Sequence, residues 1–157
     1  MITTKEKDKD KEARLILWVN LRNLSPNERM MKEFAVYHFE RVDRQTSNEG
    51  WLIVGDTHNA GLTNVNLDVK IFLITCLQSY YPRGLKYILV PEFPIILEAT
   101  VRIVLTFANQ ELRDRIKFMR NEELRQYLDD EQIPEYYKVR PGEIIVNNLP
   151  LISSILG

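Results

Sequence analysis

Residues 61–119 have the sequence GLTNVNLDVKIFLITCLQSYYPRGLKYILVPEFPIILEATVRIVLTFANQELRDRIKFM, and this stretch decides the fold. It predicts a helix, a strand, a second helix and a second strand, in that order. A surface helix normally carries a polar face over about half of its circumference, whereas both predicted helices are apolar around most of theirs. Such helices need apolar neighbours on two sides. The sheet supplies one side, and more protein, a partner, a membrane or a bound lipid must supply the other.

The second of these helices, residues 94–107, has the more unusual pattern. Its only charged side chains are Glu98 and Arg102, four residues apart, which together make one narrow polar stripe. The apolar positions fall on two faces, with Ile96, Ala99, Ile103 and Phe107 on one and Leu97, Val101, Val104 and Leu105 on the other.

Strands and helices alternate along the rest of the chain. The predicted strands are residues 14–20, 51–57, 85–90 and 115–119. The predicted helices are residues 26–44, a segment from Asn64 or Asn66 to Tyr81, residues 94–107 and residues 121–128. The first helix is expected to turn Met31, Phe34, Val42 and either Ala35 or His38 inward. This alternation implies a three-layer α/β domain, with a mostly parallel sheet, right-handed crossovers and helices on both faces.

The two ends of the chain differ in composition from the segment between them. Residues 1–12, MITTKEKDKDKE, are a mixed-charge tract that predicts a solvated, disordered leader. Residues 13–137 form the predicted domain. Residues 138–157 are an atypical tail, whose apolar pieces add an edge strand, cover a pocket or mark an altered terminus.

Composition narrows the class of protein. The net charge of −1 offers no basic field for nucleic acid, so no nucleic-acid partner is expected. The single cysteine, Cys76, argues against a disulfide framework and fits a reducing compartment. No apolar run approaches the roughly 18 residues of a membrane span, and the charged N-terminus has no signal-peptide core. A cytoplasmic protein is expected.

No residue pattern predicts catalysis, a metal or a cofactor. Gly55-Asp56-Thr57-His58 resembles the first metal-binding box of metallophosphoesterases, but such sites need several further boxes of ligands. The only other histidine is His38, on a predicted helix, so Asp56 is expected to order the turn that follows it. Hydrolysis through Asp56 and His58 is one hypothesis for the function, and it is weaker than the two described below. Cys76 is expected in the core.

Several pieces of the sequence together resemble the CRAL-TRIO lipid-binding lobe of phosphatidylinositol-transfer, retinal-binding and tocopherol-binding proteins. These pieces, in order, are GLTNVNLD, SYYPRGLKYILV, FPIILEATVRIVLTF, DRIKFM and EELRQYL. The most specific part is Tyr80-Tyr81-Pro82, followed by a strand, Pro94, an apolar helix and a basic strand. The resemblance covers roughly residues 11–136, and within the family the chain is similar to the lipid-binding domain of motile-sperm-domain proteins.

The resemblance implies that residues 94–107 are a gate helix over a hydrophobic pocket. A non-enzymatic protein that binds and transfers or senses a lipid or other hydrophobic small molecule is then expected. It would touch a membrane surface transiently and be peripherally membrane-associated. The alternative is an interaction module of the same fold that binds a small GTPase or a signalling partner, and a pocket filled by side chains would favour it.

The predicted lipid contacts come from the central strands, the apolar helices and one basic strand. They are Ile53, Phe72, Cys76, Tyr80, Leu89, Ile96, Ala99, Ile103, Phe107 and Arg115. Tyr80 is expected to turn its hydroxyl towards a headgroup, and Arg115 matches the family's basic residue near the gate. Phosphoinositide-binding members place a Glu directly after the Tyr-Tyr-Pro motif, where this chain has Arg83, so inositol-lipid specificity is not predicted.

Overall fold

The structure is a computed structural model that describes residues 2–3, 9–12, 14–20, 28–46, 49–58, 61 and 66–138. Its strands are β1 (Ile2–Thr3), β2 (Leu15–Asn20), β3 (Trp51–Asp56), β4 (Leu85–Pro91) and β5 (Ile116–Met119). Its α-helices are α1 (Glu28–Gln45), α2 (Leu67–Tyr80), α3 (Glu98–Leu105), α4 (Gln110–Arg115) and α5 (Glu135–Lys138). Short 3₁₀ helices are η3 (Ile95–Leu97), η4 (Asn121–Gln126) and η5 (Asp130–Gln132).

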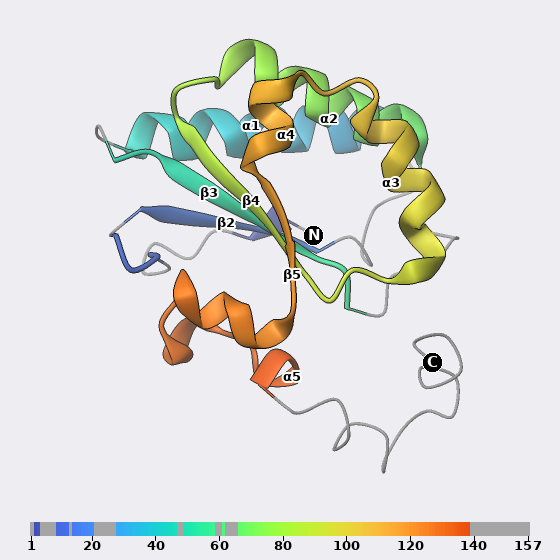
Figure 1. Cartoon of the computed structure of the whole chain (residues 1–157). Helices are drawn as coiled ribbons and strands as arrows, with labels where there is room; N and C mark the ends of the chain where they lie inside the picture. The colour runs from blue at the N-terminus through green and yellow to red at the C-terminus, as the bar shows by residue number, and fades with distance from the viewer. Residues whose placement is uncertain are drawn as a thin grey trace.

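The strands form one sheet in the order β1-β2-β3-β4-β5. β1 is antiparallel to β2, and each of the other neighbours is a parallel pair. Because each parallel strand lies beside the one before it, the connecting helices α1, α2, α3 and α4 lie on the same side of the sheet (Figure 1). The predicted α/β fold with a mostly parallel sheet is confirmed.

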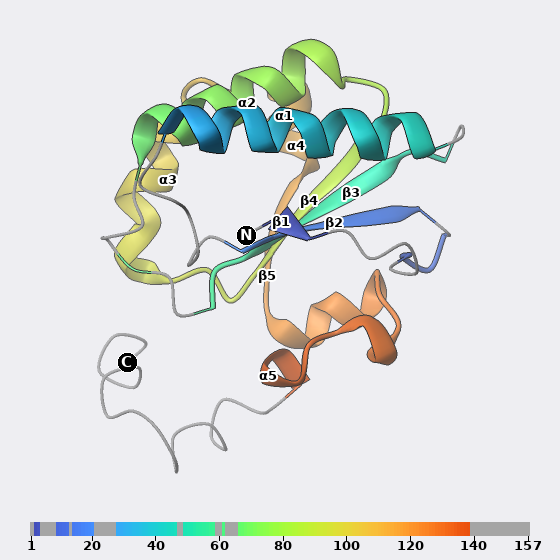
Figure 2. The ribbon, with the colours of Figure 1, turned by 180° about the vertical axis from the view of Figure 1, so that it is seen from behind.

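Two apolar cores lie on the two faces of this sheet. The first joins the sheet to α1, α2 and α4, and Phe39 and Trp51 are its largest fully buried side chains. The second joins the sheet to η4, η5 and α5, the orange segment after β5 (Figure 1). Seen from behind, α1 and α2 cover one face, and η4, η5 and α5 cover the other (Figure 2). These are the three layers that the sequence predicts.

The helix α1 packs through a stripe with helical spacing. Met31, Ala35 and Val42 are buried as predicted, and Phe39, which was not predicted, is 2% exposed in the same stripe. Phe34 is 40% exposed, so its predicted inward orientation is wrong, because the spacing that aligns Ala35 with Phe39 puts Phe34 at the side. The predicted start of this helix at residue 26 lies outside the described residues, which resume at residue 28.

The helix α2 begins and ends as its local chemistry predicts. Of the two alternative starts, Asn66 is the N-cap, and its side chain accepts a hydrogen bond of 3.1 Å from the backbone N–H of Val69. At the other end, Tyr81 is the C-cap, and Pro82 follows it.

The segment between β4 and β5 is more broken than the sequence predicts. Instead of one helix over residues 94–107, it forms η3, then α3, and then the separate helix α4. The side chain of Asn109 caps α4 by accepting from the N–H of Leu112 (2.8 Å), which starts the new helix. At the start of the segment, Glu92 has a left-handed φ of 45° and turns the chain away from β4.

The N-terminal tract is partly built into the domain. Ile2–Thr3 pair with β2, and Asp10, 5% exposed, forms an ion pair of 2.6 Å with Arg14. The backbone N–H of Lys11 donates to the carbonyl of Tyr127 (2.9 Å). The predicted solvated, disordered leader is therefore wrong for residues 2–3 and 9–12, because Asp10 finds a buried partner that composition does not reveal. Residues 139–157, nearly all of the predicted tail, lie outside the described residues.

Candidate hydrophobic ligand site

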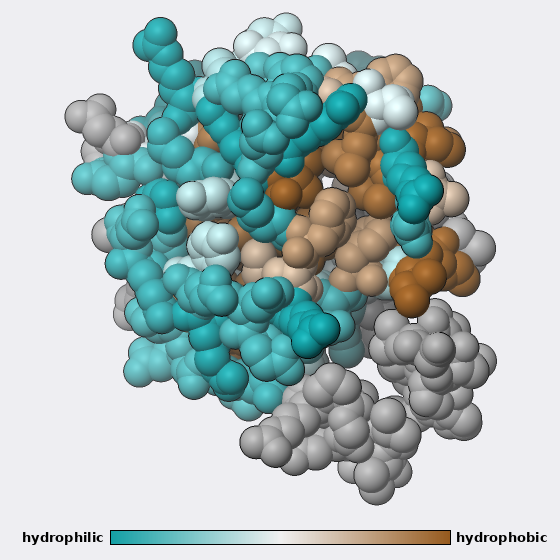
Figure 3. Space-filling view, viewed as in Figure 1, coloured by the Kyte–Doolittle hydropathy of each residue, from teal (hydrophilic) through white to brown (hydrophobic). Residues whose placement is uncertain are grey.

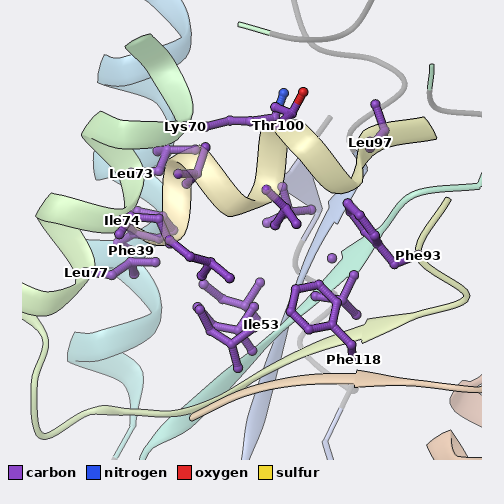
Figure 4. A pocket seen from close by; sticks show the side chains of 18 of the residues that line it. Phe39, Ile53, Lys70, Leu73, Ile74, Leu77, Phe93, Leu97, Thr100 and Phe118 are labelled. Atoms are coloured by element: carbon purple, nitrogen blue, oxygen red, sulfur yellow. The ribbon is translucent and has the colours of Figure 1, made fainter. Parts of the chain in front are cut away.

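A cavity of about 170 Å³ lies between the sheet, α2 and α3 (Figure 4). Its floor comes from β2, β3, β4 and β5, and its walls from α1 and α2. The roof is formed by Leu97 of η3 and by Thr100, Val101, Val104 and Leu105 of α3. Almost all of the lining side chains are apolar, so the cavity offers an environment in which hydrocarbon leaves water favourably.

The pleat of the sheet explains which strand residues form the floor. Ile53 and Gly55 are two residues apart on β3 and therefore face the same side. Gly55 contributes no side chain, and a Cβ placed there would meet only Val90 Cγ2 at 3.6 Å and the Leu89 carbonyl at 3.8 Å. Space above Gly55 therefore belongs to the cavity.

An irregularity in β4 decides its contribution to the floor. The pairing with β3 shifts between Trp51 and Leu52, so that Leu52 lies opposite Tyr87 and Ile53 opposite Ile88. Because of this shift, Ile88 faces the same side as Leu85, and Leu89 faces the second core. The prediction that Leu89 lines the pocket is wrong for this reason, whereas Ile53 does line the cavity.

Residues 94–107 have the two predicted apolar faces, but the face predicted to line the pocket is exposed and the other face lines it. Val104, on the second predicted face, is buried against the cavity. Ile96, Ile103 and Phe107 are 45%, 47% and 49% exposed, and Ala99 is also exposed. Predicting these residues as pocket lining is wrong, because periodicity defines two faces without showing which of them meets the sheet. Figure 3 shows the resulting apolar surface around α3, beside an otherwise hydrophilic face.

The predicted contacts on α2 also lie away from the cavity. Phe72 packs beside α1, where the Lys32 ammonium lies 5.2 Å from its ring centroid. Cys76 is buried in the first core, and burial, followed by the charge of Glu40, raises the pKa of its thiol. The face of α2 that lines the cavity is Lys70, Leu73, Ile74 and Leu77.

Neither predicted headgroup contact reaches the cavity. Tyr80 is 75% exposed, and it is the neighbouring Tyr81 that is buried, with its hydroxyl donating to Glu40 (2.6 Å). Arg115 donates to the carbonyls of Pro82 (2.6 Å) and Leu85 (2.7 Å) and pairs with Glu111. Arg115 therefore holds the start of β4 against α4.

Several lining residues were missed although the sequence carries a signal for them. Ile116 and Phe118 alternate along β5, so the pleat puts both on one face, and Phe118 packs edge-on against Phe93 with 5.3 Å between ring centroids. The spacing of Lys70, Leu73 and Leu77 is that of one helical face.

Hydrogen bonds fasten the C-terminal end of α3 to α2. The Gln78 side-chain amide donates to the Phe107 carbonyl (3.0 Å), and its oxygen accepts from the backbone N–H of Asn109 (2.8 Å). Arg113 adds a bond from Nε to the Leu105 carbonyl (3.1 Å). These contacts hold the C-terminal end of the segment that covers the cavity, and the turn at Glu92 lies at the start of that segment.

Asp56 orders its surroundings in the way the sequence predicts. Its carboxylate accepts from the backbone N–H of His58 (3.0 Å) and from the hydroxyls of Tyr136 and Tyr137. The ring of His58 stacks on Tyr136 with 4.3 Å between centroids. Within the described residues, no group of three His, Cys, Asp or Glu side chains is placed to hold a metal ion.

Comparison with known proteins places this geometry in a family. The CRAL/TRIO domain family matches residues 6–138, which is most of the chain. The chain therefore belongs to this family of lipid-binding and lipid-transfer domains. The narrower likeness to motile-sperm-domain proteins stays a prediction.

Individual relatives are more distant. Tyrosine-protein phosphatase non-receptor type 9 of Mus musculus, Homo sapiens and Rattus norvegicus is 25% identical over 91 residues, which are 58% of this chain. The match spans only 15% of those relatives and lies in their CRAL/TRIO part, so the activity in their name is not carried over. The crystal structure of Sfh5 has a TM-score of 0.63 at 16% identity, covering 95% of this chain and 65% of that one, which shows the fold alone.

Within the described part of the chain, no helix combines the length and the apolar character that a membrane span needs.

Proposed function

We propose that this domain binds a hydrophobic ligand, and carries or senses it without chemistry, in the cavity beneath α3. The observation that carries the proposal is the cavity itself. A space of about 170 Å³ remains between apolar strand and helix side chains, although close packing normally leaves few voids larger than water. Membership of a lipid-binding family supports the same conclusion.

The size of the cavity limits what fits while α3 is in place. An apolar cavity of about 150 Å³ accommodates a molecule of roughly benzene size. The present cavity of about 170 Å³ therefore holds a small hydrophobic molecule or part of one acyl chain, and a two-chain lipid requires α3 to swing outward. The hinge contacts at Gln78 and the turn at Glu92 are the places where such movement would occur.

Moving a lipid between the cavity and a membrane changes its free energy little. Burying hydrocarbon is worth about 0.8 kcal/mol per CH₂ relative to water, but a lipid leaves a bilayer that is equally apolar. The protein must therefore shield the ligand during transfer. Within the proposal, the exposed residues Ile96, Ile103 and Phe107 meet the membrane surface transiently, and the domain works at the cytoplasmic face of that membrane.

An interaction module that binds a GTPase or signalling protein is the alternative. It predicts a pocket filled by its own side chains, and the open volume beneath α3 favours the ligand carrier instead.

Plugging the cavity at Gly55 tests the proposal. Gly55→Ala, Gly55→Val and Gly55→Leu add increasing volume to a position whose Cβ makes only ordinary contacts. Glycine is unfavourable inside a strand, so Val is expected to keep or raise the free energy of unfolding. Binding should fall stepwise along the series, measured by titration calorimetry with decanol and by mass spectrometry of co-purified lipid. We expect more than about tenfold weaker decanol binding for Leu, the loss of roughly two buried CH₂ contacts.

The series is expected to keep or raise stability while it weakens binding, and this combination distinguishes a plugged cavity from an unfolded variant. A variant that unfolds loses stability and binding together, whereas a plugged cavity loses binding alone. Wild-type protein that binds neither decanol nor co-purified lipid, or a Leu variant that binds as wild type does, would contradict the proposal.

A further inference from the structure

The outer face of the segment that covers the cavity is apolar and exposed to solvent. Ile96, Ile103 and Phe107 on this face are all half-exposed. The two charged side chains of α3, Glu98 and Arg102, form an ion pair with each other, so they add no net charge to the face. Because a large exposed apolar patch on a folded domain marks a site of contact, this face calls for an apolar, uncharged occupant.

The described chain ends on the edge of the sheet at which this face begins. The hydroxyl of Tyr137 in α5 donates to Asp56, the last residue of β3 (2.5 Å). The hydroxyl of Thr57, the next residue, donates to the carbonyl of Glu92 (3.4 Å), in the turn that leads from β4 to η3. The helix α5, the end of β3 and the start of the covering segment are therefore neighbours, and the chain that follows Lys138 leaves the domain close to η3.

The sequence after α5 has the composition that this face requires. Residues 139–157 lie outside the described residues, and residues 144–157, IIVNNLPLISSILG, contain no charged side chain. Within them, Leu151, Ile152 and Ile155 recur at the spacing of one helical face, with two serines between the isoleucines. This end of the chain therefore offers an uncharged apolar surface of its own.

We propose that residues 149–156 pack against the exposed face of η3 and α3 in the same molecule. Residues 139–148 span up to about 33 Å when extended, and the face from η3 to Phe107 is about 20 Å long at helical rise, so the connection is long enough. Because both surfaces belong to one chain, the high effective concentration favours even a weak contact between them.

This contact regulates the proposed site. Residues 149–156 would cover the same side chains that the proposed function turns towards a membrane, so the membrane must displace them before the ligand is exchanged. The contact itself stands on the exposed face and the composition of residues 144–157. Only the competition with a membrane rests on the proposed function.

A spin label near the end of the full chain tests the contact. Cys76 is buried and the pKa of its thiol is raised, so Ser153→Cys supplies the reactive thiol. A nitroxide there should broaden the amide signals of residues 95–107 but not those of residues 40–45, at the far end of α1 from α3 (Figures 1 and 2). A spin-labelled chain mixed with an isotope-labelled chain that has no nitroxide should broaden neither set, because the contact lies within one molecule.

Charge substitutions locate the contact on both of its sides. Ile152→Asp at the end of the chain and Ile103→Asp on α3 should each abolish the broadening, since each places a carboxylate in an apolar contact. Ser154→Asp puts the same charge between the apolar positions and should leave the broadening unchanged. Ile103 is exposed in the described domain, so thermal unfolding should show that Ile103→Asp stays folded.

Binding to phosphatidylcholine vesicles tests the regulation. Ile152→Asp should bind several-fold more than wild type because its face is uncovered, and Ile103→Asp should bind less than Ile152→Asp. Broadening in wild type without vesicle binding by any variant would keep the contact and contradict the proposed membrane contact alone. The inference is overturned if wild type shows no broadening, if the broadening appears only between copies, or if it survives both Ile152→Asp and Ile103→Asp.

Discussion

At the scale of single residues, His38 is a polar side chain that is buried beside aromatic rings. It is 7% exposed, and its ring lies 4.4 Å from the ring of Phe34 and 5.3 Å from that of Tyr37. Within the described residues, neither of its ring nitrogens has a hydrogen-bond partner. Burial, and then the positive charge of Arg41, lower the pKa of His38 from its usual value of 6.5. The fold therefore favours the neutral form of this imidazole.

This lowered pKa predicts a loss of stability in mild acid. Below pH 6.5 the unfolded chain takes up a proton that the folded His38 resists, so the free energy of unfolding falls as pH drops from about 7 to 5. His38→Phe, which keeps an aromatic ring beside Phe34, should flatten this dependence. Urea unfolding at several pH values measures it, and His58→Phe is the control histidine. A slope between pH 7 and 5 that survives in His38→Phe unchanged would refute the assignment.

At the scale of elements, the proposed function requires α3 to move, and the junction between α2 and α3 is where its C-terminal end is held. Val104 and Leu97 anchor the inner face of the gate through burial, while Gln78 holds its C-terminal end by two hydrogen bonds. Both bonds are exposed to water, so each adds only modestly to stability. If α3 opens as the proposed function requires, we expect these bonds to affect the rate of opening more than the stability of the closed state.

Gln78→Leu should therefore speed ligand exchange more than it weakens binding. We expect stability to fall by about 1 kcal/mol, and the dissociation rate of decanol to rise several-fold, because the hinge loses both bonds while the cavity lining is unchanged. Stopped-flow displacement measures the rate. Gln126→Leu, an exposed glutamine on η4 at the opposite face of the sheet, is the matched control. Unaltered exchange rates in Gln78→Leu would show that α3 opens elsewhere or not at all.

At the scale of the whole molecule, Asp56 joins the sheet to α5. Its buried carboxylate lies at the end of β3 and receives the hydroxyls of Tyr136 and Tyr137, some eighty positions later in the chain. Tyr137 also belongs to the second core, together with Leu124 and Leu128. One acidic side chain therefore fastens the third layer onto the sheet.

Removing one hydroxyl from this junction should destabilise the whole domain. Tyr137→Phe leaves the ring in the core but deprives a buried carboxylate of a hydrogen bond, which costs about 1.5–3 kcal/mol. Denaturant unfolding measures the loss, and a double-mutant cycle with Asp56→Asn isolates the pair. Tyr127→Phe, a half-buried tyrosine of the same core that does not bond Asp56, is the control. A cost equal to that of the control would mean that the bond to Asp56 adds nothing.

Features set by neighbouring residues were predictable from the sequence. Asn66 starts α2 because its own side chain caps the N–H of Val69, and Pro82 follows its end because proline cannot continue a helix. The apolar run of β4 indicated a strand of a parallel sheet, because strands buried on both faces of such a sheet have continuous apolar sequences. The alternation of such elements then predicted the three layers, whereas the gate was implied only by the family resemblance.

The lining of the site was decided by contacts across the fold. Helical period placed Ile103 and Val104 on different faces, but only the position of the sheet made Val104 the inner one. A pairing shift in β4 turned Ile88 into the cavity and Leu89 away from it, although strand alternation counted from Leu85 indicates the reverse. The sequence by itself determined the elements, because caps, breaks and periods act between near neighbours. Only the tertiary structure decided which face of each element meets the cavity, because that depends on what packs against it.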